Sequence, residues 1–385
     1  MNSAWKSSSV MVKPSVMKSE RWVTFLRDLG LEVLPGEGDQ GLSTASIVEE
    51  VAKERCVVAV TGTHGRGTVA GMLVSILEAA SQEPGYLLST APTHLKGAVS
   101  GGSGRVLVIE VDGGWDLLPS RGADIVVCSF LSAGDESGPE IARRLRELLI
   151  GGARLREAFF NLDCRQNRSL VATLPLRPTG YSMEHRTEYE GQAMGSDDGA
   201  AQVLGVYRRG RKVSEIPLAV RGDHNAINAL GAVAVARRFG IKEEDIARGL
   251  STFEGLRPSE KVIVGGGVEV RALVASSMPE VKDALSKEGE TPHGERWLVV
   301  SEDVEWAEAK PELQGRWVRE GEELPAGKKG RAWLMERVEQ GDQIWLIGGD
   351  TTHGRAERLR AQLASRAEST PEAGEQPRLD GPLNE

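Results

Sequence analysis

Residues 57–68 read Val-Val-Ala-Val-Thr-Gly-Thr-His-Gly-Arg-Gly-Thr, and a helical pattern of apolar residues follows over 69–79. The apolar β-branched run predicts a buried strand, and the glycines after it predict a tight turn that opens directly into the helix. Small residues in such a turn let backbone N–H groups close on phosphate oxygens, and the helix N-terminus adds partial positive charge. The stretch therefore predicts a phosphate-binding loop.

Two positions of this loop differ from the usual pattern. Such loops commonly end in Lys followed by Ser or Thr; the Lys reaches the β- and γ-phosphates and the hydroxyl holds Mg²⁺. Here Arg66 and Gly67 occupy these positions. Arg66 keeps a positive charge, but its longer, planar group is a poor geometric substitute, and the alternative reading is a surface arginine after a turn. Gly67 has no hydroxyl, and Thr68 points about 100° further round the helix.

Composition describes a globular protein and excludes several classes. The chain has 385 residues, 40% hydrophobic and 27% charged, so two or three domains are expected. The net charge of −9 argues against a nucleic-acid-binding surface. No apolar run approaches the ~20 residues of a membrane span, and residues 1–20 lack the apolar core of a signal peptide. The three cysteines show no metal-ligand spacing. We therefore expect a cytoplasmic protein.

Strand and helix patterns alternate along most of the chain. Residues 1–54 predict a small N-terminal unit with helices over 19–29 and 44–53 and a strand over 31–34. The alternation that follows predicts an α/β fold with a mostly parallel sheet, and residues 200–219 predict an antiparallel edge. The pattern restarts near residue 256, with a further helix expected over 354–367. The predicted domains are an N-terminal domain over 1–54, a central domain over 55–255, a C-terminal domain over 256–367 and a disordered tail over 368–385.

Four motifs in fixed order resemble the Mur ligases. Residues 61–68 are similar to that family's phosphate loop, in the variant with His after Gly-Thr that marks the UDP-N-acetylmuramate–L-alanine ligase and murein-peptide ligase branch. Residues 108–112, Val-Ile-Glu-Val-Asp, resemble the strand that carries an acidic Mg²⁺ ligand. Residues 222–230 resemble the Gly-x-His-Asn-x-x-Asn-Ala helix start that contacts adenine, and residues 253–257 resemble the hinge before the third domain.

The resemblance implies a three-part architecture: a shortened N-terminal domain, a central ATP-binding domain with a P-loop-type, mostly parallel sheet, and a C-terminal Rossmann-like domain. It also implies ATP and Mg²⁺ as cofactors and a UDP-muramyl carboxylate as substrate. In the family, ATP phosphorylates this carboxylate and an amine displaces the phosphate. The resemblance gives catalytic roles to Arg66 and Glu110 and makes Thr68 and Glu110 metal ligands. The expected nucleotide-binding residues are Gly62, Thr63, His64, Gly65, Arg66, Gly67, Thr68, His224, Asn225, Asn228 and Arg257.

Each of these roles has a plainer alternative. Glu110 ends an apolar strand, so it is either a metal ligand or a solvated acid at a strand end. His224, Asn225 and Asn228 also fit an ordinary helix start. Charged family positions are lost elsewhere: residues 129–136 lack a histidine, although Asp135 or Glu136 is a possible substitute, and residues 272–279 contain no ionisable side chain.

Three functions therefore stay open from the sequence. The first is an active ATP-dependent amide ligase of peptidoglycan-precursor synthesis. The second is a catalytically degenerate homologue that acts as a scaffold for a protein partner. The third is a regulator that holds ATP without turning it over. ATP affinity with and without Mg²⁺, followed by phosphate release with UDP-N-acetylmuramate and L-alanine, separates them.

Overall fold

The computed structural model describes residues 9–36, 40–111, 115–132, 138–195, 202–257, 259–265, 268–274, 295–300, 316–319, 328–339, 342–348, 359 and 362–363. Contacts between residues divide the chain into two compact units, with the boundary between residues 258 and 259. The predicted division at residue 54 stays a prediction, because residues 1–258 fall in one unit. Among the sequence expectations, the tail over 368–385, Asp135, Glu136, residues 275–279 and most of the helix over 354–367 lie outside the described residues.

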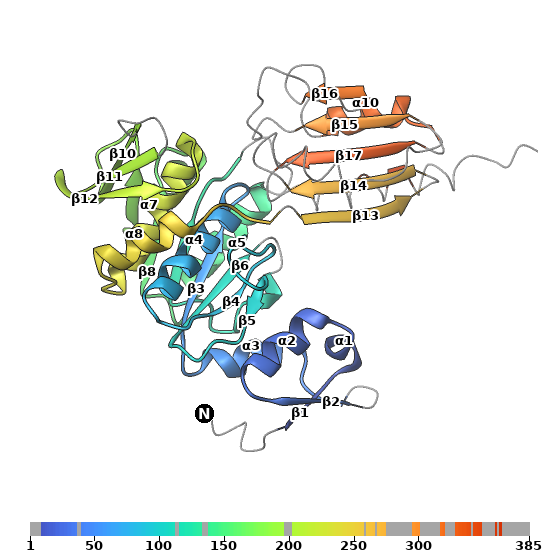
Figure 1. The fold of residues 1–385 in the computed structure, drawn as a ribbon, viewed down its shortest axis with the longest axis horizontal. Coiled ribbons are helices and arrows are strands. Elements are labelled where there is room, and N and C mark those ends of the chain that lie inside the picture. Colours follow the sequence, from blue (N-terminus) through green and yellow to red (C-terminus); the bar gives the residue numbers. More distant parts are fainter. Residues whose placement is uncertain are drawn as a thin grey trace, which may run out of the picture. The chain divides into compact units, whose positions relative to one another are not determined.

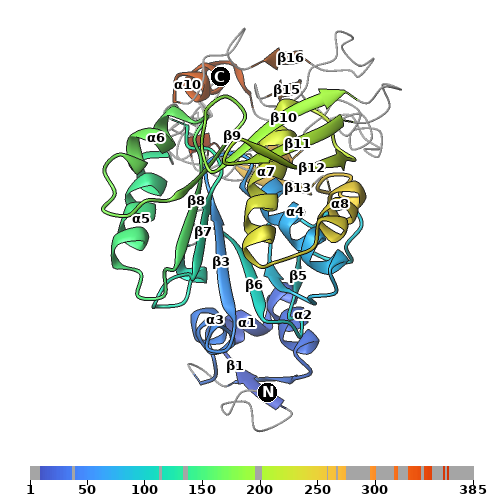
Figure 2. The ribbon, with the colours of Figure 1, turned by 90° about the vertical axis from the view of Figure 1, so that its left-hand side faces the viewer.

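The first unit is built on a sheet that has ten strands in the described part of the chain (Figures 1 and 2). The strands run in the order β12 (Arg211–Leu218), β11 (Gln202–Arg208), β10 (Tyr189–Gly195), β9 (Thr179–Ser182), β8 (Glu157–Asn161), β7 (Ile125–Cys128), β3 (Cys56–Thr61), β6 (Val106–Val111), β4 (Gly85–Leu87) and β5 (Val99–Ser100). Neighbours from β4 to β10 pair in parallel, whereas β5, β11 and β12 pair antiparallel. The predicted parallel sheet and the antiparallel edge over 200–219 are thus confirmed.

The central strands are mostly apolar because both of their faces are covered. Successive side chains of β3 alternate between faces: Val58 and Val60 join one core, and Val57 and Ala59 join the other. The first core is completed by α4 (Arg66–Ala79), α7 (Asp223–Arg238) and α8 (Glu243–Thr252), as Figure 2 shows. The second is covered by α5 (Gly138–Gly151), by η2 (Trp115–Leu117), by α6 (Arg165–Val171) and by the N-terminal segment.

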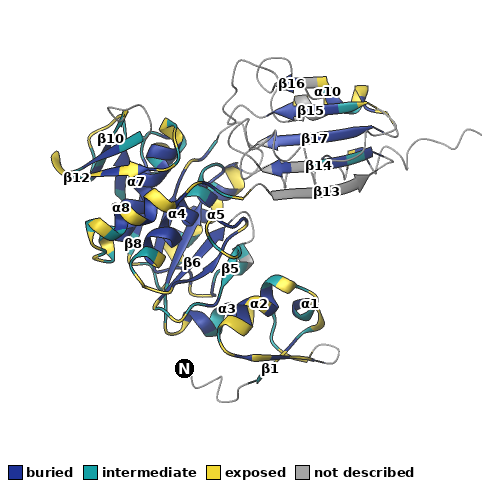
Figure 3. Ribbon diagram, viewed as in Figure 1, coloured by how far each residue is buried: buried dark blue, intermediate teal, exposed yellow. Residues whose placement is uncertain are grey.

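The N-terminal segment packs directly on the second face of this sheet. It consists of β1 (Ser9–Val12), α1 (Pro14–Met17), α2 (Glu20–Asp28), β2 (Glu32–Pro35) and α3 (Thr44–Ala52), which agrees with the helices and strand predicted there. Strands β1 and β2 pair in parallel. Phe25, Leu26 and Ile47 are fully buried in the same core as Val57 and Ala59 of β3. Figure 3 shows dark blue, buried stretches along α2 and α3.

The second unit is a smaller α/β sheet. In its described part the order is β13 (Ser259–Gly265), β14 (Val268–Val274), β17 (Gln343–Gly348), β15 (Arg296–Val300) and β16 (Arg316–Arg319). All neighbours pair in parallel except β13 with β14. Helix α10 (Lys328–Arg337) contributes Leu334 to a core with Trp297 and Ile344. The predicted α/β pattern after residue 256 is therefore present.

Candidate functional site

The loop between β3 and α4 lies at the carboxyl ends of the parallel strands, where α/β sheets commonly bind ligands. Its two principal glycines are required by their surroundings. Gly62 and Gly65 have φ values of 146° and 74°. A β-carbon on Gly62 would lie 2.3 Å from Ser129 Oγ, and one on Gly65 would lie 2.5 Å from Asn228 Oδ1. The loop therefore lies where a phosphate-binding loop is expected. The backbone conformation and the close contacts at positions 62 and 65 require glycine there.

Two amide groups of the loop are engaged by the protein itself. The backbone N–H groups of Thr63 and His64 donate to the Phe130 carbonyl at 2.6 and 3.4 Å. The Thr63 hydroxyl donates to the same carbonyl and accepts from the Ser132 N–H. The Ser129 hydroxyl donates to the His64 carbonyl at 2.6 Å. This side of the loop is therefore bound to the segment that follows β7, and its binding of a polyanion stays a prediction.

Arg66, the first residue of α4, turns inward. Its Nε lies 3.3 Å from Glu110 Oε1, and the side chains are only 4% and 1% exposed. Its Nη1 donates to the Gly62 carbonyl at 3.2 Å and to the Thr63 carbonyl at 3.3 Å. The alternative of a surface arginine is therefore wrong. The guanidinium nevertheless contacts carbonyls of the loop and the carboxylate on β6. Its positive charge therefore faces these groups, whereas the resemblance predicts that it faces phosphate.

Glu110 is buried near the end of β6, so the alternative of a solvated strand-end acid is also wrong. Its Oε2 accepts the backbone N–H of Ser89 at 2.7 Å, while Oε1 faces Arg66. Gly67 provides no hydroxyl, and within the described residues the Thr68 hydroxyl makes no hydrogen bond. These residues do not fit Mg²⁺ as they stand, because the carboxylate that would bind the ion is already neutralised. The assignment of Thr68 and Glu110 as metal ligands stays a prediction, and this geometry counts against it.

The start of α7 brings one of the three predicted adenine contacts to the loop. Asn228 is buried and lies against Gly65. Asn225 is also buried, but its side chain donates to the Arg221 carbonyl at 2.6 Å, which is a local contact. His224 is exposed, and within the described residues it has no hydrogen bond to the loop. The structure thus joins Asn228 to the phosphate loop, and the adenine contacts themselves stay predictions.

Arg257 holds a different part of the chain. Its backbone N–H donates to the Ala91 carbonyl at 2.7 Å, and its guanidinium donates to the carbonyls of Thr93 and Leu95. These residues follow β4, so Arg257 fastens the end of the first unit to that connection. Within the described residues it makes no ion pair with the loop, and its contact with a nucleotide stays a prediction.

Sequence reasoning missed three residues of the site. Ser129 and Phe130 come directly after β7, and Ser89 lies two residues after β4. All three act through a hydroxyl or a backbone group, which no charge pattern identifies. Their position after parallel strands was the available signal, because such positions meet at one edge of the sheet.

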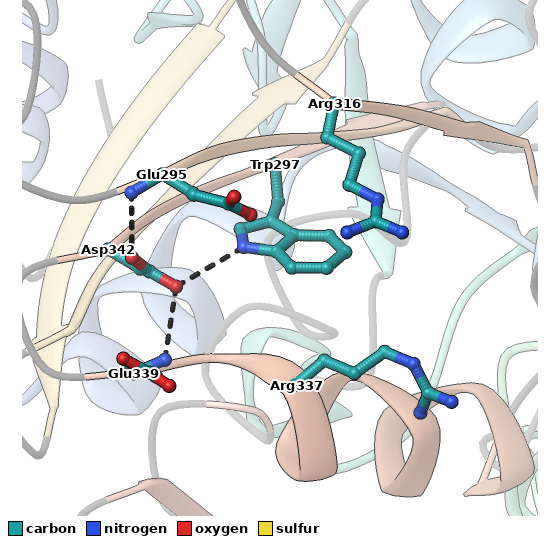
Figure 4. A pocket seen from close by; sticks show the side chains of 6 residues that line it. All are labelled: Glu295, Trp297, Arg316, Arg337, Glu339 and Asp342. Carbon is teal, nitrogen blue, oxygen red and sulfur yellow. Dashed lines mark hydrogen bonds between the residues drawn. The ribbon is translucent and has the colours of Figure 1, made fainter.

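The second unit contains a cavity of about 330 Å³ (Figure 4). It lies near the starts of β15, β16 and β17, the opposite end from the usual ligand crevice. Asp342 accepts hydrogen bonds from the Trp297 indole and from the N–H groups of Glu295 and Glu339. Arg316 stacks over the Trp297 ring at 4.8 Å. The Asp342 carboxylate therefore has hydrogen-bond partners within the protein. We interpret the cavity as a structural feature.

Asp163, Glu184 and His185 bring possible metal-ligand atoms within 4.8 Å of one another. The Asp163 carboxylate, however, accepts from the Ser182 hydroxyl and from the N–H groups of Met183 and Glu184. His185 lies 3.1 Å from Arg168 Nη1, measured from its Nε2. This cluster is explained as the hydrogen-bonded turn after β9.

No protein-family model matches the chain. Among curated proteins, UDP-N-acetylmuramate–L-alanine ligase of Chlorobaculum parvum is 24% identical over 265 residues, covering 68% of this chain and 55% of the relative. The enzyme of the same name from Rhizobium meliloti is 29% identical over 230 residues, covering 55% and 47%. The chain thus spans about half the length of the curated relatives it matches. The murein peptide ligase of Psychrobacter arcticus superposes with a TM-score of 0.51 at 16% identity, covering 90% of this chain and 84% of that one.

The fold is that of the Mur ligases, with a large, mostly parallel central sheet. The curated proteins that the chain resembles in sequence are UDP-N-acetylmuramate–L-alanine ligases, at about 25% identity. None of the described helices is long and apolar enough to cross a lipid bilayer.

Proposed function

We propose that this chain is a Mur-type protein of peptidoglycan-precursor metabolism in which the central site no longer carries out phosphoryl transfer. In this proposal it acts by binding, either as a scaffold for a protein partner or as a regulator that senses a nucleotide or a UDP-muramyl compound, in the cytoplasm. The single observation that carries the proposal is the buried ion pair between Arg66 and Glu110.

Phosphoryl transfer depends on positioning and on neutralising the charge of the transferred group. An ATP-dependent ligase therefore needs a cation directed at the phosphates and a carboxylate available to the metal. Among the described residues of the loop and β6, Arg66 and Glu110 are the candidates for these two roles, and they form a buried ion pair with each other. Breaking a buried ion pair of this kind costs about 3–5 kcal/mol. The binding of Mg·ATP would have to offset that cost.

A second candidate function is an active ligase that joins an amino acid or peptide to a UDP-muramyl carboxylate through an acyl phosphate. The contact of Asn228 with Gly65 favours it, because the loop and the start of α7 still meet as a nucleotide site requires. The names of the curated relatives support the same reaction. Under this alternative the loop rearranges on binding ATP, and Arg66 leaves Glu110 to reach the phosphates.

Phosphate release in the presence of Mg·ATP, UDP-N-acetylmuramate and L-alanine separates the two candidates. The proposal predicts no release above that of the Glu110→Gln variant, which serves as the matched control. It also predicts that Arg66→Lys with Gly67→Thr strengthens Mg·ATP binding, measured by calorimetry. Release by the wild-type chain that the Glu110→Gln substitution abolishes would establish the ligase and overturn the proposal.

A further inference from the structure

Among the described residues, oxygen atoms from two separate segments lie beside the Arg66 guanidinium. The carbonyls of Gly62 and Thr63 accept from its Nη1, and Glu110 Oε1 lies 3.3 Å from its Nε. The carbonyls belong to the turn after β3, and the carboxylate belongs to the neighbouring strand β6. A single positive group therefore joins the loop to the adjacent strand.

Burial makes that positive charge necessary. A carboxylate as buried as that of Glu110 needs a partner that compensates its charge. The Ser89 N–H supplies one hydrogen bond, but it carries no net charge. A divalent cation at Oε1 would have to share the buried space with the guanidinium, which repels it. The site is therefore suited to one resident cation.

We propose that the Arg66 guanidinium is this resident cation and a permanent part of the chain. It compensates the charge of Glu110 and links Glu110 to the carbonyls of Gly62 and Thr63, as a divalent metal ion at this position would. The free protein accordingly has no divalent-cation site at Glu110. This inference deepens the proposed function, because it names the chemistry that closes the site.

The test removes the guanidinium and asks whether a metal ion replaces it. Arg66→Ala leaves one carboxylate and two carbonyl oxygens, the hard ligands that Mg²⁺ and Mn²⁺ prefer. The melting temperature of the wild-type chain should not change with saturating MnCl₂. The melting temperature of Arg66→Ala should be lower than that of the wild type and should rise by roughly 4 °C or more with MnCl₂.

Two controls assign the effect to the charge at Glu110. The double variant Arg66→Ala with Glu110→Gln should lose the response to MnCl₂. Arg154→Ala is a comparable loss of a partly buried, hydrogen-bonded arginine, because Arg154 donates to Asp124 and to the Ala52 carbonyl, each at 2.7 Å. Asp124 keeps a second partner, with Arg156 Nε at 3.4 Å, so Arg154→Ala should be destabilised without responding to MnCl₂.

A second measurement needs only the folded wild-type chain. The electron paramagnetic resonance spectrum of Mn²⁺ should be that of the free ion when the protein is added. Binding of Mn²⁺ by the wild type that Glu110→Gln abolishes would overturn the inference, as would an Arg66→Ala variant that folds and ignores MnCl₂. If the wild-type chain catalyses ligation but does not bind free Mn²⁺, this result refutes the proposed function and leaves the present inference standing.

Discussion

Asn228 of α7 and Gly65 of the loop are in such close contact that a β-carbon at position 65 would lie 2.5 Å from Asn228 Oδ1. Gly65 also has a φ of 74°, a conformation that costs other residues roughly 1–2 kcal/mol. Gly65→Ala should therefore lower the free energy of unfolding by more than this backbone cost alone. Adding Asn228→Ala should recover the part caused by the clash, measured as a double-mutant cycle in urea. Strictly additive effects would show that the two residues do not touch.

The Arg66–Glu110 pair should behave as a buried ion pair in unfolding experiments. Glu110→Gln or Arg66→Met alone should lower the free energy of unfolding by about 3–5 kcal/mol, because each removes one partner of a buried ion pair. The double variant should be more stable than either single variant. The exposed pair of Arg143 and Glu140 is the comparison, and Arg143→Ala should leave the urea midpoint near that of the wild type. Equal effects at both pairs would contradict the buried geometry.

The N-terminal segment should unfold together with the central sheet, because they share a core. Phe25 is fully buried beside the β3 face that carries Val57 and Ala59. Phe25→Ala should lower the free energy of unfolding by about 3–5 kcal/mol and keep a single transition for the first unit. Far-ultraviolet circular dichroism checks this together with the fluorescence signal of Trp22, taken as the difference between otherwise identical proteins with and without Trp22→Phe, because the chain has eight tryptophans. A separate, earlier transition of Trp22 would show that residues 9–52 form an independent domain.

Stability at alkaline pH should depend on Tyr86 of β4. Burial, and then the nearby carboxylates of Glu78 and Asp28, raise the pKa of Tyr86 from 10.0 to about 12. Between these values the unfolded chain loses the phenolic proton and the folded chain keeps it, so stability falls as pH rises from 10 to 12. Tyr86→Phe should reduce this fall, measured from urea midpoints at pH 9 and pH 11. An unchanged fall would show that other groups dominate this range.

Much of the site's location was predictable from local sequence, whereas its contacts were not. The apolar run of β3 and the glycines after it determine where the loop lies, and Glu110 at the end of β6 follows from the same strand pattern. The inward orientation of the Arg66 side chain was not predictable, because it depends on the distance to the buried Glu110 carboxylate on β6. The hydrogen bonds from the N–H groups of Thr63 and His64 to the Phe130 carbonyl are likewise tertiary contacts. They are made by backbone groups, which the side-chain sequence does not reveal.

The most direct test of the account is a crystal structure of the wild-type chain grown with ATP and excess MnCl₂, with anomalous scattering measured at the manganese edge. The account predicts that Arg66 stays paired with Glu110 and that no manganese peak lies beside this carboxylate. A manganese ion bound to Glu110, with the guanidinium displaced towards the phosphates, would contradict it.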